Sequence, residues 1–216
     1  TPQVFEDNPF IEVFQFRQDV YSLFSESVDG MGDTWHHLVL GSTKALLIDT
    51  GFGVGDLLSV VKNLIGSREL MVAITHEHLD HCYGNYQFDA VHCHAFALPI
   101  LQSMMRPTIW DPLFDDQGNG IFLDCKRKDC IPYKPYIPIA CEHGTIFDLG
   151  GGCLVEVLHT PGHAPGGASF LDYSHRILFT GAMHSNYVSI SCNPAKRASH
   201  PFGNLASIPA YENCLH

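Results

Sequence analysis

No part of this sequence restricts its fold and chemistry more than a short apolar run that leads directly into a dense group of histidines. Residues 71–75 are bounded by turns and predict a buried strand. The next six residues are His76, Glu77, His78, Leu79, Asp80 and His81. His76 and His78 stand two apart and can point toward one ion, while Asp80 and His81 fall where a helix would begin. Because imidazole and carboxylate suit zinc or a similar divalent ion, the segment predicts a metal site at the end of this strand.

The amino-acid composition limits which classes of molecule this protein is expected to bind. The 216 residues include 14 His, 12 Lys and Arg, and 23 Asp and Glu, for a formal net charge of −11. A charge of this sign repels nucleic-acid phosphates and acidic membrane surfaces. No apolar stretch approaches the ~18 residues of a membrane span, and the start of the sequence lacks a secretory-signal pattern. We therefore expect a cytoplasmic protein with a small-molecule substrate, and neither nucleic acid nor a membrane as partner.

The apolar pattern predicts two sheet-bearing halves separated by an irregular excursion. Strands are expected over residues 11–16, 20–24, 35–40, 45–48, 71–75, 146–147, 154–158, 168–171 and 177–179. One helix is expected over residues 57–65, capped by Asp56 and stopped by Gly66. Residues 102–136 lose this regularity and predict an insertion or lid. The eight cysteines are expected to be mostly reduced, because an apolar core of this size needs no disulfide framework.

A second motif supplies a third imidazole. Residues 159–167 read His-Thr-Pro-Gly-His-Ala-Pro-Gly-Gly, so a strand ends in a Pro-Gly turn that lifts His163 out of the sheet. A lone histidine in a turn is more often a surface residue than a ligand. Together with His76 and His78, however, His163 completes three protein ligands, and three ligands plus water is the arrangement of a catalytic zinc site.

On these two motifs, and on residues 46–51 and 177–181, the chain resembles the metallo-β-lactamase superfamily of metallohydrolases. The resemblance covers most of the sequence. It implies an α/β (α+β) fold, a four-layer αββα sandwich with the metals at one edge between two sheets. We expect residues 1–216 to form a single domain of this type, with residues 102–136 as its insertion or lid.

The resemblance also implies roles for individual residues. His76, His78 and His163 would hold the first metal, and Asp80 and His81 would serve the second, with Asp80 also taking part in catalysis. One or two divalent ions are expected, zinc first and iron or manganese as alternatives. The implied reaction is hydrolysis of an ester, thioester or lactone by a metal-activated water.

Two departures from the family pattern affect the second metal. The family places a bridging aspartate after Phe-Thr-Gly, where this sequence has Ala182, and a methyl group cannot coordinate. The family's final histidine has no clear counterpart here. His200 and His216 are the histidines available for this position, but no strand pattern leads into His216, and no other feature of the sequence supports either residue as a ligand. The chain is thus a fragment lacking the C-terminal elements, a variant disabled at the bridging position, or a divergent member. The alternative function is a catalytically impaired metal-binding or ligand-sensing protein on the same scaffold.

Two further residues are predicted to contact substrate. His184 follows Ala182 closely and would line the pocket, and Trp110 would reach it from the insertion. For residues 102–136, a lid over the metal site and a small satellite core are equally compatible with the sequence. His92 and His94 are expected to be structural.

Overall fold

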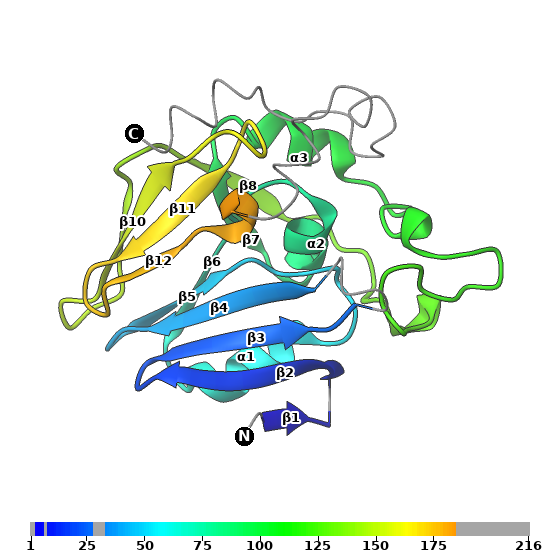
Figure 1. The fold of residues 1–216 in the computed structure, drawn as a ribbon, viewed down its shortest axis with the longest axis horizontal. Coiled ribbons are helices and arrows are strands. Elements are labelled where there is room, and N and C mark those ends of the chain that lie inside the picture. Colours follow the sequence, from blue (N-terminus) through cyan, green and yellow to red (C-terminus); the bar gives the residue numbers. More distant parts are fainter. Residues whose placement is uncertain (1–2, 7, 28–32, 185–216) are drawn as a thin grey trace.

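The computed structural model describes residues 3–6, 8–27 and 33–184, which form two facing β-sheets with helices on one side (Figure 1). The larger sheet has eight strands in chain order, antiparallel from β1 to β5 and parallel from β5 to β8. Its strands are β1 (Gln3–Phe5), β2 (Asn8–Arg17), β3 (Val20–Ser25), β4 (Thr34–Leu40), β5 (Lys44–Ile48), β6 (Glu69–Ala73), β7 (Ala90–His94) and β8 (Ile137–Cys141).

The smaller sheet is antiparallel and follows the long excursion. Its spatial order is β12-β11-β10-β9. Its strands are β9 (Ile146–Asp148), β10 (Leu154–His159), β11 (Ala168–Asp172) and β12 (Ile177–Phe179). Alternating side chains of both sheets meet in a core that includes Leu46, Ile48, Val155 and Phe170, all 2% exposed or less. The two sheets are therefore joined by apolar packing.

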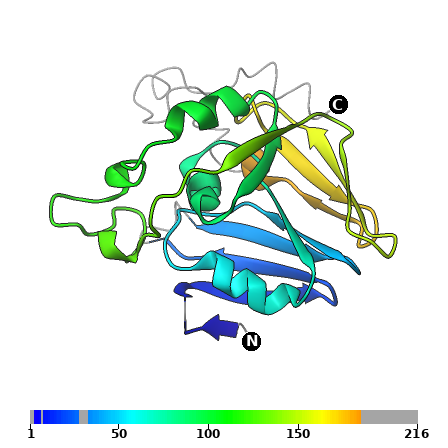
Figure 2. The same cartoon turned by 180° about the vertical axis from the view of Figure 1, so that it is seen from behind.

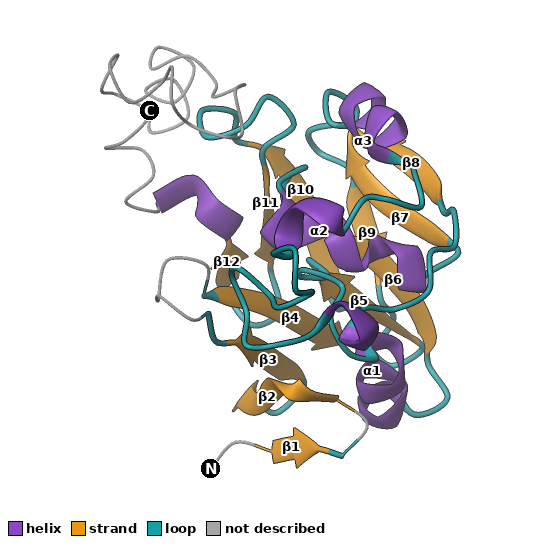
Figure 3. Cartoon of the chain, turned by 90° about the vertical axis from the view of Figure 1, so that its right-hand side faces the viewer, coloured by secondary structure: helices purple, strands orange, loops and turns teal. Residues whose placement is uncertain are grey.

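The helices cover the other face of the larger sheet, as Figures 2 and 3 show from behind and from the side. They are α1 (Leu57–Ile65), α2 (Leu79–Cys82) and α3 (Leu98–Met104), with the short 3-10 helix η1 (Tyr83–Gln87) directly after α2. Two further 3-10 helices, η2 (Asp111–Leu113) and η3 (Arg127–Asp129), lie between α3 and β8, and η4 (Gly181–His184) follows β12 of the smaller sheet. The Asp56 side chain caps α1 by accepting a hydrogen bond from the Ser59 amide at 2.8 Å. Within the described ranges, no helix is long and apolar enough to cross a membrane.

The first half follows the sequence prediction closely. The expected hairpin is β2 and β3, and α1 has the predicted bounds. The strand expected over residues 71–75 is β6, which ends earlier, at Ala73. The strand ends early because the Thr75 amide donates to the Asp49 carboxylate at 2.6 Å instead of to a neighbouring strand. This turn directs the histidine-rich segment away from the strand.

The layers match three of the four expected from the family resemblance. All three α-helices of the described ranges contribute to the core on the outer face of the larger sheet, through Leu57, Leu79 and Leu101 among others. On the smaller sheet, Ile146, Leu154 and Leu178 are 36–47% exposed. The described residues therefore form a helix–sheet–sheet arrangement, and a fourth, helical layer is not among them.

The segment over residues 102–136 packs into the main core. Ile109, Trp110 and Leu113 are at most 4% exposed and belong to the cluster between the larger sheet and the helices. The Trp110 ring is fully buried, and its Nε1 donates to the Phe52 carbonyl at 3.1 Å. The substrate contact predicted for Trp110 is therefore wrong for this structure, because a buried ring presents no surface to a ligand. The apolar side chains of this segment are buried in the core although its sequence has the irregular pattern of a surface loop.

Trp110→Ala should lower the free energy of unfolding by about 3–5 kcal/mol, because it removes a fully buried aromatic side chain and leaves a cavity. Metal content per folded chain should be unchanged. Denaturant unfolding with elemental analysis tests both. The other tryptophan is a matched control, since Trp35 is 45% exposed and Trp35→Ala should cost clearly less. Unchanged stability with altered metal content in Trp110→Ala would restore the lid hypothesis.

Candidate metal centre

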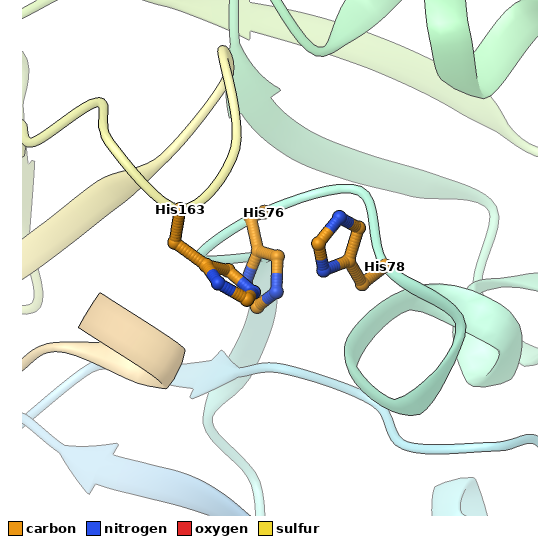
Figure 4. A group of neighbouring side chains, drawn as sticks. All are labelled: His76, His78 and His163. Carbon is orange, nitrogen blue, oxygen red and sulfur yellow. The ribbon is translucent and has the colours of Figure 1, made fainter. Parts of the chain in front are cut away.

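Three histidines from the two sheets converge on one point. His76 and His78 follow β6, and His163 lies in the loop between β10 and β11. One ring nitrogen from each lies within 4.8 Å of the others. Figure 4 shows the rings of His76 and His163 side by side, with His78 facing them from the start of α2. The structure thus brings together the three residues predicted to hold the first metal.

His76 has the tautomer and charge of a metal ligand. The Thr75 hydroxyl donates its single hydrogen to the Asp49 carboxylate at 2.8 Å, so it accepts from His76 Nδ1 at 3.0 Å. This leaves the lone pair on Nε2, which is buried and has no hydrogen-bond partner among the described residues. Burial, together with the neighbouring imidazoles, holds the pKa of His76 well below its usual value. A neutral imidazole with a buried free lone pair fits a divalent ion.

His81 lies beside this cluster, between two carboxylates. Its Nδ1 is 2.8 Å from Asp49 Oδ2, and its Nε2 is 3.3 Å from Asp80 Oδ2. Burial alone would lower the pKa of His81, but the Asp80 and Asp49 carboxylates outweigh it and raise this pKa to about 10. Burial would raise the pKa of Asp80, but the charge of His81 lowers it to about 2. A second ion would have to separate this pair, so the second-metal role of both residues stays a prediction.

Asp49 connects these groups, and no role was predicted for it beyond its place in the segment of residues 46–51. It follows β5, is 1% exposed, and has the left-handed backbone φ of 67°. Its carboxylate accepts from the Thr75 amide, the Thr75 hydroxyl and His81 Nδ1. One feature of the sequence could have identified Asp49, namely an acidic residue directly after an apolar strand. A carboxylate buried at such a position needs hydrogen-bond donors around it.

Glu77 joins the two ligand-bearing loops. It is 5% exposed, and burial raises its pKa, while hydrogen bonds from the backbone of Glu77 and Gly166 act in the opposite direction. A Cβ on Gly166 would lie 2.7 Å from Glu77 Oε2 and 2.4 Å from the Ala97 Cβ. Only glycine therefore lets the loop that carries His163 approach the loop that carries His76. Nothing in the sequence pattern identified this contact.

A cavity of about 470 Å³ opens beside Asp80 and His81. Ala182 lines it, so the position expected to hold a bridging carboxylate does face this part of the site. The remaining wall includes aromatic and aliphatic side chains, among them Phe16, Trp35, Ile177, Leu178 and Phe179. His184 ends η4, but its side chain lies outside the described part of the structure, as do His200 and His216.

Four other histidines, His36, His37, His92 and His94, lie outside the three-histidine cluster, and His37 also lines the cavity. His36 is 1% exposed, and His37 bonds with the Ser22 hydroxyl at 3.1 Å. Burial lowers the pKa of both to about 4, so both are neutral at pH 7. His92 contacts a backbone carbonyl, and His94 stacks on His159 with ring centroids 3.8 Å apart. His92 and His94 thus make structural contacts, as expected.

Asp49→Ala should lower the free energy of unfolding by about 3–5 kcal/mol, because it leaves a buried imidazolium and two buried Thr75 donors without their partner. Metal content should fall too, since Thr75 would no longer orient His76. Chemical denaturation and elemental analysis are the measurements. Asp116→Ala, at an exposed position, is the control and should stay within about 0.5 kcal/mol of the parent. Equal stability of the two variants would contradict the anchoring role of Asp49.

Comparison with known proteins identifies relatives of this chain. The sequence model of the metallo-beta-lactamase superfamily matches residues 30–205. The acyl-coenzyme A thioesterase MBLAC2 of Homo sapiens is 31% identical over 181 residues, which cover 77% of this chain and 63% of that protein. The protein of the same name from Gallus gallus is 28% identical over 158 residues, 67% of this chain and 55% of its own length. The chain therefore spans 55–63% of the length of these relatives.

Solved structures agree in fold. A metallo-beta-lactamase from Pontibacter korlensis has a TM-score of 0.60 and 18% identity, covering 84% of this chain and 78% of that one. The DIM-1 metallo-beta-lactamase has a TM-score of 0.53 and 18% identity, with 81% and 71% coverage. These structures show the fold, and the family model over residues 30–205 together with the curated relatives establishes that the chain belongs to the metallo-β-lactamase superfamily.

Proposed function

We propose that this chain is a metal-dependent hydrolase of thioesters, and that acyl-coenzyme A thioesters are its substrate class. The observation that carries the proposal is the convergence of His76, His78 and His163 within 4.8 Å. The names of the curated relatives, acyl-coenzyme A thioesterases at about 30% identity, support thioesters over other esters.

The chain's own residues would divide the chemistry as follows. His76, His78 and His163 would hold the ion, zinc being the first choice for three imidazoles. Once bound, a zinc ion supplies Lewis-acid chemistry, lowering the pKa of water toward ~7 and polarising a carbonyl. Asp80, whose pKa of about 2 keeps it ionised, would accept a hydrogen bond from the attacking water and orient it. The Asp49–His81 pair would keep Asp80 in place.

Leaving-group chemistry also favours a thioester. An ordinary thiol has a pKa near ~8.5, so a thiolate departs with less need for a general acid than an alkoxide does. Among the described residues that line the cavity, the buried histidine nearest to Asp80 is His81, and both its ring nitrogens already face carboxylates. A substrate whose leaving group needs little protonation suits this site best.

The cavity beside Asp80 would receive the acyl part of the substrate. Trp35, Leu178 and Phe179 give it an apolar wall, and Asp80 and His81 lie at its polar side. An acyl chain laid against this wall would bury apolar surface and bring its carbonyl toward the three histidines.

His78→Ala should lower bound zinc by one ion per chain and reduce acyl-coenzyme A hydrolysis by at least about a hundredfold, because a ligand and its ion are lost together. Release of free coenzyme A thiol, measured on the zinc-loaded chain, follows the reaction, and elemental analysis follows the metal. The matched control is His143→Ala, since His143 is an exposed histidine outside the cluster. Equal hydrolysis by the parent and both variants would contradict the assignment. Zinc binding without hydrolysis would support the non-catalytic alternative.

Ala182→Asp tests whether the bridging position limits the site. The aspartate should raise bound metal above that of the parent chain and increase turnover, because it adds an anionic ligand beside Asp80. Ala182→Asn is the matched control, since its amide has a similar shape and no charge. A gain in metal and turnover for Asp alone supports a catalytic site weakened at residue 182. No gain for either variant would show that this position does not limit metal binding.

A further inference from the structure

A second group of metal-ligand side chains lies at the other end of the smaller sheet. Cys153 precedes β10, Asp172 ends β11, and His175 lies in the turn that leads to β12. One ligand atom from each lies within 4.8 Å of the others, the same limit that the three histidines of the metal centre satisfy. The six residues of β10, at about 3.3 Å each, put about 20 Å between Cys153 and the loop that begins after His159. The two groups are therefore separate.

The β11–β12 turn fixes two of these side chains. Asp172 is fully buried, and its Oδ1 accepts from the Ser174 amide at 2.9 Å and the His175 amide at 3.1 Å. Its Oδ2 lies 2.7 Å from His175 Nδ1. The carboxylate and the imidazole are thus held side by side by the backbone. Two ligands in fixed positions reduce the conformational entropy that binding an ion would cost.

The third side chain approaches from another strand and makes a hydrogen bond with Ser174 of the turn. Cys153 is 7% exposed and belongs to the core between the sheets. The charges that act on its thiol come from three carboxylates, Asp172, Asp19 and Asp148. An anionic setting of this kind favours a cation. Figure 1 shows the β11–β12 turn at the end of the sheet away from α2. The His175 side chain is 20% exposed, so one side of the group is open to water.

We propose that Cys153, Asp172 and His175 form a second zinc site, which links the β11–β12 turn to the start of β10 and leaves one position for water. A sulfur, a nitrogen and an oxygen ligand plus one water give zinc its usual four partners. In a tetrahedral site the ligand atoms lie about 3.5 Å apart, so Asp172 Oδ2 and His175 Nδ1, now 2.7 Å apart, separate slightly when the ion replaces the hydrogen bond between them. The thiol releases its proton to solvent when it binds.

Cobalt(II) separates this site from the histidine cluster by spectroscopy. A thiolate ligand gives cobalt a charge-transfer band in the near ultraviolet, and the cluster of His76, His78 and His163 contains no thiolate. Titration of the full chain with cobalt should produce this band, with a final amplitude that corresponds to one thiolate-bound cobalt per chain. Cys153→Ser should abolish it and lower bound cobalt by one per chain, while His78→Ala should leave it in place. The matched control is Cys141→Ser, since Cys141 is equally buried in the same core.

The proposal fails if the folded parent chain shows no near-ultraviolet band at saturating cobalt, or if the band survives in Cys153→Ser. His175→Gln guards against misfolding of the cysteine variant, because His175 is partly exposed and tolerates change better. Circular dichroism checks that each variant is folded. In folded His175→Gln, cobalt affinity at the thiolate band should fall at least about tenfold. An unchanged affinity there would exclude His175 as a ligand and overturn the three-residue site.

Discussion

The buried carboxylate of Asp49 holds the metal centre in shape. It takes the Thr75 amide out of the sheet, and it accepts the Thr75 hydroxyl hydrogen, so that Thr75 in turn fixes the ring of His76. The same carboxylate holds His81. These bonds are charge-assisted and buried, which makes them stronger than bonds between neutral groups in water. The left-handed backbone at Asp49 is a local cost that the surrounding contacts offset.

This one carboxylate also separates two kinds of histidine within a single short segment. His76 contacts other imidazoles and is buried, and both effects favour its neutral form. His81, equally buried, faces Asp49 and Asp80, and their charges reverse the effect of burial. His76 and His81 are only five residues apart, so their position along the sequence does not explain why their pKa values differ. The positions of the carboxylates decide which imidazole offers a lone pair and which carries a charge.

The features that could be predicted from the sequence are those specified by residues within one short segment. Helix α1 was predicted with its bounds because its cap, its apolar spacing and its terminating glycine all lie within the segment. His76 and His78 stand out for the same reason, and His163 was identified from its turn motif together with these two histidines. Asp49 was missed because its partner, Thr75, is 26 residues away. Trp110 was misassigned because an irregular segment carries no periodicity that says which side faces the core, and long-range burial decides that.

The metal centre lies where the two sheets meet, and this gives a bound ion a structural effect. Thr75, two residues after β6, accepts a hydrogen bond from the Ala168 amide at the start of β11. Glu77 and Gly166 bring the two loops together a few residues away. His76 and His78 belong to one sheet's loop and His163 to the other's, so an ion shared by all three links the sheets directly. Since the unfolded chain does not hold these ligands together, the free energy of metal binding adds to the free energy of unfolding. Any residue that keeps the sheets in register thereby also sets the affinity of the metal centre.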